Sequence, residues 1–185
     1  MFIKKILFFL IVFNCFLNSH ADEKQLIINR LLEINNFTFN FKQVAQGKTE
    51  VGNCFFVFDN KLKCIYFNEK QKEIIINNKT LVVIQKKFNK TYFYPISKSP
   101  FMQILNKTSL INLVKGANLE LKDNINIFFL DKNKKQTVIL FDKENYNLIG
   151  WEIEDELQNK IYFSLKIQNI NAEIDNNIFK IPSFN

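Results

Sequence analysis

The side chains that most often carry catalysis are nearly absent from this chain. Its one histidine is His20, so the residues after it contain no imidazole to act as a general base or to bind zinc. Its one arginine is Arg30, and no glycine-rich loop of the phosphate-binding type occurs. These features argue against familiar hydrolases and nucleotide-dependent enzymes. We therefore expect no cofactor and no metal site.

Acidic residues offer one further candidate for catalysis. Glu152, Glu154 and Glu156 alternate along one segment, and two such carboxylates could act as a general acid and a general base. Alternate positions of a strand also share one face, so a solvent-facing strand explains the spacing more simply. We predict that the protein is not an enzyme.

Two cysteines lie about equally far from a predicted turn at Asp59-Asn60. Cys54 and Cys64 could face each other across a hairpin, and an oxidising compartment would favour a disulfide between them. The spacing leaves open the alternative of two buried thiols. A redox-active pair would prefer the Cys-x-x-Cys spacing at a helix start, which is absent here.

The N-terminal residues have the pattern of a secretion signal. Lys4 and Lys5 precede an apolar run over residues 6–17, which is shorter than the roughly 20 apolar residues of a membrane span. The small residues Ser19 and Ala21 follow at the positions that a signal peptidase reads. We predict a cleaved signal peptide at residues 1–21 and a single domain at residues 22–185, with cleavage before Asp22.

Two alternatives to a cleaved, soluble product stay open. One is an uncleaved membrane anchor. The other is a lipoprotein of receptor type, lipidated at Cys15, although the preceding Phe13 and Asn14 are bulky or polar where such a site needs small side chains. Mass spectrometry of the mature N-terminus distinguishes these products.

The charge of the chain is moderately basic and evenly spread. Without residues 1–21 it keeps 23 Lys and Arg residues against 18 Asp and Glu residues, a formal charge of +5. The lysines are scattered through the turns and outward strand positions, which is typical of a solvated surface and not of a nucleic-acid-binding face. We expect no nucleic-acid partner.

The spacing of apolar residues predicts one helix followed by many strands. Leu26 to Ile34 has helical periodicity, with a cap near Asp22. Beyond it the period changes to two, with asparagines taking the turn positions where glycine is more usual. We predict antiparallel strands around Phe37–Phe41, Cys54–Phe58, Leu62–Phe67, Glu73–Ile76, Thr80–Gln85, Lys90–Pro95, Ile125–Phe129, Thr137–Phe141, Ile149–Ile153 and Ile161–Ile167.

A short second helix interrupts this series. Ser97 or Ser99 would cap it, Pro100 would lie in its first turn, and Phe101, Ile104 and Leu105 would form its apolar side. This segment, SKSPFMQIL, resembles the lid-helix region of the periplasmic outer-membrane lipoprotein carrier family, the LolA-like chaperones. Further resemblances are a strand ending in Phe41-Lys42-Gln43, the hairpin after Gly52, Lys79-Thr80-Leu81 and the terminal Phe179-Lys180-Ile181-Pro182.

The resemblance implies a mainly β fold with a few helices, an open, incomplete antiparallel barrel of about eleven strands closed by a helical lid. It also implies a monomeric periplasmic carrier that holds the acyl chains of lipoproteins in an apolar cavity. In that family an inner-membrane ABC transporter releases the lipoproteins and an outer-membrane receptor accepts them. The residues that we assign to the cavity and lid are Leu31, Phe37, Phe39, Phe41, Phe56, Phe58, Pro100, Phe101, Met102, Ile104, Leu105 and Trp151.

The chain departs from that family at the first hairpin. Family members carry an arginine near its tip that holds the lid closed, whereas Phe58 and Asp59 occupy this position here. Apolar contacts of Phe58 with Phe101 and Met102 would then hold the lid. The alternative function is a periplasmic β-sandwich that binds a partner protein or senses envelope stress, without a lipid cavity.

Overall fold

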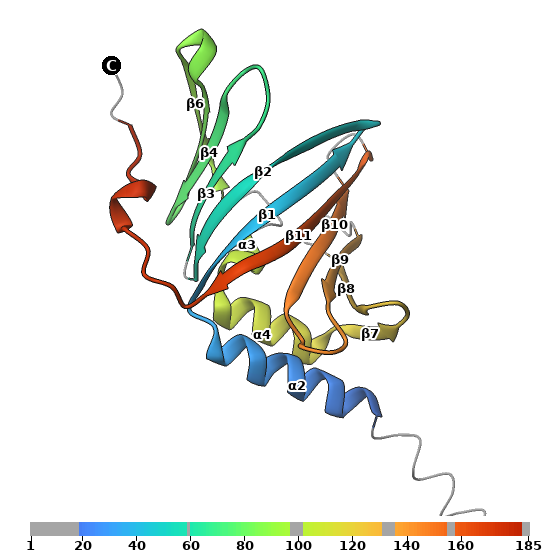
Figure 1. The fold of residues 1–185 in the computed structure, drawn as a ribbon. Helices are drawn as coiled ribbons and strands as arrows, with labels where there is room; N and C mark the ends of the chain where they lie inside the picture. Colours follow the sequence, from blue (N-terminus) through green and yellow to red (C-terminus); the bar gives the residue numbers. More distant parts are fainter. Residues whose placement is uncertain (1–18, 59, 97–101, 131–135, 155–157, 183–185) are drawn as a thin grey trace, which may run out of the picture.

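One open antiparallel sheet curves around the helices of the protein (Figure 1). The computed structural model describes residues 19–58, 60–96, 102–130, 136–154 and 158–182. The strands within this part of the chain are β1 (Asn36–Ala45), β2 (Lys48–Val57), β3 (Lys61–Tyr66), β4 (Lys72–Asn77), β5 (Thr80–Gln85), β6 (Lys90–Pro95), β7 (Asn118–Leu121), β8 (Ile125–Leu130), β9 (Gln136–Phe141), β10 (Leu148–Glu154) and β11 (Lys160–Ile170).

The described strands form a single sheet in the order β6-β5-β4-β3-β2-β1-β11-β10-β9-β8-β7. β1 lies at its centre, where it pairs with both β2 and β11. β6 and β7 are the two edges and do not pair with each other, so the barrel stays open. This arrangement confirms the predicted open antiparallel barrel of eleven strands.

Alternating side chains give the sheet its apolar inner face. Phe37, Phe39 and Phe41 are each at most 4 % exposed, whereas the outward-pointing Asn40 and Lys42 between and beside them are exposed. Because neighbouring strand positions point to opposite faces, one register buries the whole phenylalanine row. The predicted asparagine turns are also confirmed, since Asn60, Asn78 and Asn89 adopt positive φ values of 75°, 55° and 50°.

Three helices in the described part of the chain cover the concave side and one end of the sheet (Figure 1). Ile27 and Leu31 of the first helix, Ile104 and Leu105 of the second, and Leu110 of the third are buried in the same core. Lys24 Nζ also donates to Ala117 O at 2.5 Å and to Lys115 O at 3.2 Å, which fastens the first helix to the end of the third. The helices are α2 (Ser19–Glu33), α3 (Met102–Leu105) and α4 (Lys107–Gly116).

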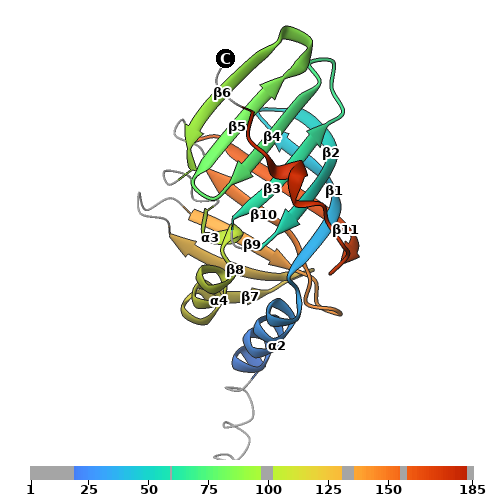
Figure 2. The same ribbon diagram turned by 90° about the vertical axis from the view of Figure 1, so that its left-hand side faces the viewer.

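The C-terminal segment crosses the outer face of the sheet at β3 and β4 (Figure 2). Its 3-10 turn η3 (Asn176–Phe179) buries Phe179 completely, and Asn77 Nδ2 donates to Phe179 O at 3.1 Å. This segment explains why Ile75 and Val82, which point away from the concave side, are also buried.

The structure corrects several sequence predictions. β1 and β2 are longer than predicted and continue to a turn at Gln46-Gly47. In β10, Ile149 points outward, because a register shift between Leu148 and Gly150 puts Leu148 into the core instead. We had not predicted α4 or β7. α2 begins at Ser19, upstream of the predicted cap at Asp22, since no helix-breaking residue separates the two.

No described helix combines the length and apolar character that crossing a membrane requires. Residues 1–18 of the predicted signal peptide lie outside the described part of the chain, so the signal peptide stays a prediction.

Candidate functional site

A continuous row of aromatic rings lines the concave side of the sheet. Trp151 of β10 stacks on Phe163 of β11 with a centroid distance of 4.2 Å, and Phe163 stacks on Phe41 of β1 at 5.0 Å. Further along, Phe37 contacts Phe56 at 4.7 Å. Rings from four strands therefore form one apolar surface under the helices, with close, well-packed contacts.

Gly52 makes room for this row at the centre of the sheet. A Cβ atom at Gly52 would lie 2.1 Å from Ile65 O and 2.7 Å from a ring carbon of Phe41. The absence of a side chain leaves room for the Phe41 ring beside Gly52, and this ring also meets Tyr66 of β3 at a centroid distance of 4.8 Å. Gly52 is thus a structural part of the aromatic row.

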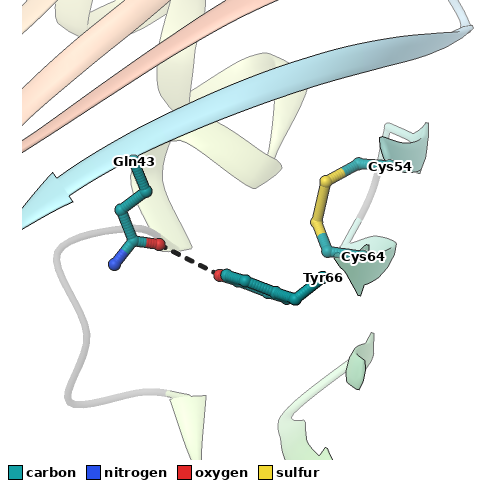
Figure 3. The surroundings of a disulfide bond; sticks show 4 residues. All are labelled: Gln43, Cys54, Cys64 and Tyr66. Atoms are coloured by element: carbon teal, nitrogen blue, oxygen red, sulfur yellow. Dashed lines mark hydrogen bonds between the residues drawn. A yellow bond between two sulfur atoms is a disulfide. The ribbon is translucent and has the colours of Figure 1, made fainter. Parts of the chain in front are cut away.

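A disulfide holds β2 and β3 together beside the aromatic row (Figure 3). Cys54 and Cys64 are direct partners in the ladder, with Cα atoms 4.1 Å apart and sulfurs bonded at 2.01 Å. Both residues are buried. The bond thus cross-links two strands whose inner faces carry Phe56 and Tyr66.

Polar side chains seal the row at the end that is remote from α2. The Tyr66 hydroxyl donates to Gln43 Oε1 at 3.0 Å (Figure 3), and Lys72 Nζ lies 3.7 Å above the Tyr66 ring. Glu50 accepts from Lys72 at 2.5 Å and from Asn68 at 2.9 Å. Burial, and secondarily the Glu50 carboxylate, raise the pKa of the Tyr66 hydroxyl well above its usual value. Tyr66 is therefore neutral at physiological pH.

The opposite end of the row is closed by α3. Ile104 and Leu105 are fully buried against the core, and Met102 packs on its margin. The backbone N–H of Asn60, in the turn between β2 and β3, donates to Leu105 O at 3.3 Å. The described part of α3 spans four residues, and two of them, Ile104 and Leu105, are buried.

An open groove of about 880 Å³ lies beside this lid, between α4 and the strands β8 and β9. Its apolar walls come from Leu113, Phe128, Phe129 and Leu130, and Leu130 is 66 % exposed. Amide side chains, Gln103 among them, complete the rim, and none of the described residues that line it is charged. The groove joins the lid helix to solvent, which gives an apolar molecule a place to approach the interior.

The structure brings the described residues of the predicted site into one cluster. Met102 lies at its margin and is partly buried. The cluster is filled by its own side chains, and the groove beside α4 is lined by other residues. Pro100 and Phe101 lie outside the described part of the chain. The buried members are Leu31, Phe37, Phe39, Phe41, Phe56, Phe58, Ile104, Leu105 and Trp151.

Phe58 packs among aromatic rings and beside a lysine, while its predicted contact with Phe101 lies outside the described residues. Its ring packs against Phe56 at 4.8 Å and Phe37 at 6.3 Å, and Lys107 Nζ of α4 lies 5.2 Å above it. Lys107 also donates to Asn35 Oδ1 at 3.0 Å. Lys107 therefore connects the start of α4 with the end of β2, near the hairpin tip where the resembling family carries an arginine.

Sequence reasoning missed two contributors to the site. Phe163 links Trp151 to Phe41, and its alternation with Ile161 and Leu165 was a sufficient signal for an inward position. The second contributor is α4, which forms one wall of the groove and which the sequence analysis did not predict. The Asn106 side chain accepts from Ser109 N at 2.9 Å, an N-cap that the sequence does display.

Among the described residues, no group of three or more histidine, cysteine, aspartate or glutamate side chains is placed to hold a metal ion.

No protein-family model matches the chain, and no curated protein matches it significantly. Solved structures do match it. An uncharacterized conserved protein of Thermus thermophilus superposes with a TM-score of 0.52 at 7 % identity, covering 88 % of this chain and 94 % of that one.

Two further solved structures superpose on the chain. MucB superposes with a TM-score of 0.51 at 12 % identity, and the match covers 88 % of this chain and 64 % of MucB. A LolA superfamily protein of Nitrosomonas europaea gives a TM-score of 0.43 at 10 % identity, covering 85 % of this chain and 97 % of that one. The open eleven-stranded barrel with its helical lid is the fold that the sequence resemblance implies, so the resemblance is confirmed at the level of the fold. At such low identity the likeness extends to the fold alone.

Proposed function

We propose that the protein is a periplasmic carrier that takes up the acyl chains of lipoproteins in its interior and moves them from the inner to the outer membrane. The observation that carries this proposal is the continuous apolar row from Trp151 to Phe58, covered at one end by α3 beside an open groove. Sequence features support export, since residues 1–21 have the pattern of a signal peptide.

The free energies of apolar burial favour replacing the buried contacts of the lid helix by those of an acyl chain. Burying one methylene contributes about 0.8 kcal/mol, so a chain of about fifteen methylenes gains on the order of 12 kcal/mol. Exposing the two buried lid residues, Ile104 and Leu105, costs about 3 to 6 kcal/mol in total. The gain from one acyl chain therefore exceeds the cost of moving α3, and the remainder offsets the rearrangement of the rings.

The carrier is passive in this account. No nucleotide-binding motif occurs in the sequence, so an inner-membrane transporter must supply the energy for loading. Unloading requires that an outer-membrane receptor bind the acyl chains more tightly than the carrier does. The partners are thus acylated lipoproteins, a lipoprotein-releasing ABC transporter and an outer-membrane lipoprotein receptor, with the carrier acting as a monomer and not as an enzyme.

A fluorescent fatty-acyl probe tests the proposal. We expect probe fluorescence to rise on addition of the protein, and a triacylated lipopeptide to reverse the rise by displacing the probe. The same peptide without acyl chains serves as the control and should leave the fluorescence unchanged. Absence of uptake, or equal displacement by both peptides, would overturn the proposal.

One observation favours the second candidate, a protein-interaction module. The interior is filled by the protein's own side chains, as it would be in a domain without a lipid cavity. Such a module takes up neither the probe nor the lipopeptide. The same titration therefore distinguishes the two functions.

A further inference from the structure

Two turns form one continuous end of the sheet. The β3–β4 turn (residues 67–71) and the β5–β6 turn (residues 86–90) lie together at the end opposite α2 in both views (Figures 1 and 2). Backbone hydrogen bonds join them, from Lys86 N to Gln71 O and from Lys87 N to Lys70 O, each at 3.4 Å. Residues from two turns that the β4–β5 hairpin separates in the sequence thus share one surface.

This end exposes two large apolar rings. Phe67 is 65 % exposed and Phe88 is 50 % exposed. Phe88 ends the 3-10 turn η1 (Lys86–Phe88), and Asn89 then reverses the chain with a φ of 50°. A groove of about 600 Å³ runs from Phe67 past Gln71 to Lys86. The rings therefore lie on an uneven apolar patch at an extremity of the molecule, where side chains are free to touch a flat surface.

Positive charge surrounds the rings. Lys70, Lys87 and Lys90 are exposed, and Lys87 Nζ lies 6.0 Å from the centre of the Phe88 ring. None of these three amines forms an ion pair within the described residues, whereas Lys86 is paired with the buried Glu73. The two turns contain four lysines and one acidic residue, Glu69, which gives them a formal charge of +3.

We propose that this basic-aromatic end (Phe67, Lys70, Lys87, Phe88 and Lys90) is a contact surface for an anionic phospholipid bilayer. Aromatic rings enter the headgroup region, where their apolar bodies leave water, and lysines beside them attract anionic headgroups. A polyanion such as nucleic acid would use the lysines but leave both rings in water. The combination of rings and amines at one extremity therefore favours a bilayer.

The proposal does not depend on the carrier function, because this end lies away from the lid. Contact through it would leave α3 and the groove beside α4 facing away from the bilayer surface (Figure 1). The carrier could thus stay at a membrane while its interior remains free to exchange its guest with a partner.

Sedimentation with vesicles tests the contact. The protein is mixed with vesicles of phosphatidylcholine alone, or of equal parts phosphatidylcholine and phosphatidylglycerol, at low and high salt. We expect binding to the anionic vesicles only, weakened by salt. Removing two lysines from an anionic surface weakens binding by about thirtyfold, so the double variant Lys87→Glu/Lys90→Glu should bind at least that much more weakly. The matched control Lys42→Glu/Lys166→Glu changes two exposed lysines on the outer face of β1 and β11 and should bind like the parent protein.

The fluorescence of an introduced tryptophan shows which part of the protein touches the bilayer. In a Phe88→Trp variant we expect emission to shift to shorter wavelength with anionic vesicles, and lipids brominated in their acyl chains to quench it. The matched Leu32→Trp variant, at an exposed site on α2, should show neither change. Equal binding by the parent protein and both double-lysine variants, or quenching at position 32 without quenching at position 88, would contradict the proposal.

Discussion

The backbone N–H of Asn60 donates to the carbonyl oxygen of Leu105 at 3.3 Å, so the tip of the β2–β3 hairpin holds the end of the lid helix. The Asn60 carbonyl in turn accepts from Asn78 N at 2.9 Å, which ties the same residue to the β4–β5 turn. Main-chain bonding thus takes the place that a hairpin arginine occupies in the resembling family. Its geometry depends on the left-handed conformation of Asn60.

Shortening a buried lid residue should speed the uptake of guests. Leu105→Ala leaves the bond from Asn60 intact but removes apolar burial from α3, which lowers the free energy of unfolding by about 2 to 5 kcal/mol. Because the open state exposes this side chain anyway, we expect the rate of acyl-probe uptake to rise by about tenfold or more. Stopped-flow fluorescence measures that rate.

Leu110→Ala is the matched control for the lid variant. Leu110 is equally buried, but it belongs to α4, which Lys24 fastens to α2. We expect a similar loss of stability with an unchanged uptake rate. Equal acceleration by both substitutions would show that general loosening, and not the lid, governs entry.

Breaking the disulfide should lower stability without changing the fold. The Cys54–Cys64 bond closes a loop with a sequence separation of 10 residues, for which the loss of chain entropy in the unfolded state is worth about 3 kcal/mol. We expect urea unfolding of the parent protein to shift to lower concentration on addition of a thiol reductant. The Cys54→Ala/Cys64→Ala variant should show the lower midpoint with or without reductant, and a midpoint shift in that variant would contradict the assignment.

A methyl group at Gly52 should be poorly tolerated. Its Cβ would lie 2.1 Å from a backbone oxygen of β3, so Gly52→Ala has to separate two paired strands and displace the Phe41 ring. We expect a loss of at least about 3 kcal/mol in the free energy of unfolding, at the upper end of overpacking effects. Gly116→Ala, with no atom within 4 Å of its added Cβ, should leave stability within about 1 kcal/mol of the parent.

Tyr66 should make the protein less stable at alkaline pH. The folded state holds its proton more tightly than the unfolded state, whose tyrosine pKa is about 10, so the unfolded state loses the proton first. This contribution to stability is complete below about pH 10 and falls by up to about 1.4 kcal/mol per pH unit above it. Tyr66→Phe should flatten this decline in stability above about pH 10, where tyrosine in the unfolded state loses its proton. Tyr162→Phe, at an exposed position, should not.

Most of the fold could be predicted from the alternation of apolar and polar residues along the strands. What this alternation could not predict has physical reasons. The period-two pattern placed Phe37, Phe39 and Phe41 on the buried face, as the structure shows. The outward turn of Ile149 could not be predicted, because a bulge changes the facing of residues without changing their order. α4 was missed although Leu110 and Val114 have helical spacing, since its short apolar run also fits a strand.

The site was less predictable than the fold because its closure depends on the backbone. A hydrogen bond between Asn60 N and Leu105 O leaves no trace in side-chain identity. Likewise Lys70 lies apart in the sequence from Lys87 and Lys90, and main-chain hydrogen bonds between the two turns bring these lysines together. Residue types alone therefore predicted an apolar interior but not what closes it.

Entry of an acyl chain between the sheet and its helices is best tested at Trp151, the single tryptophan of the chain, which is 5 % exposed and stacks on Phe163. Triacylated lipopeptides with and without bromine on their acyl chains are titrated into the protein while the emission of Trp151 is recorded. A carrier predicts that the brominated chains quench this emission and that the unbrominated ones do not. Emission that stays the same with both lipopeptides at saturating concentration would contradict the account, because the interior would then never admit the guest.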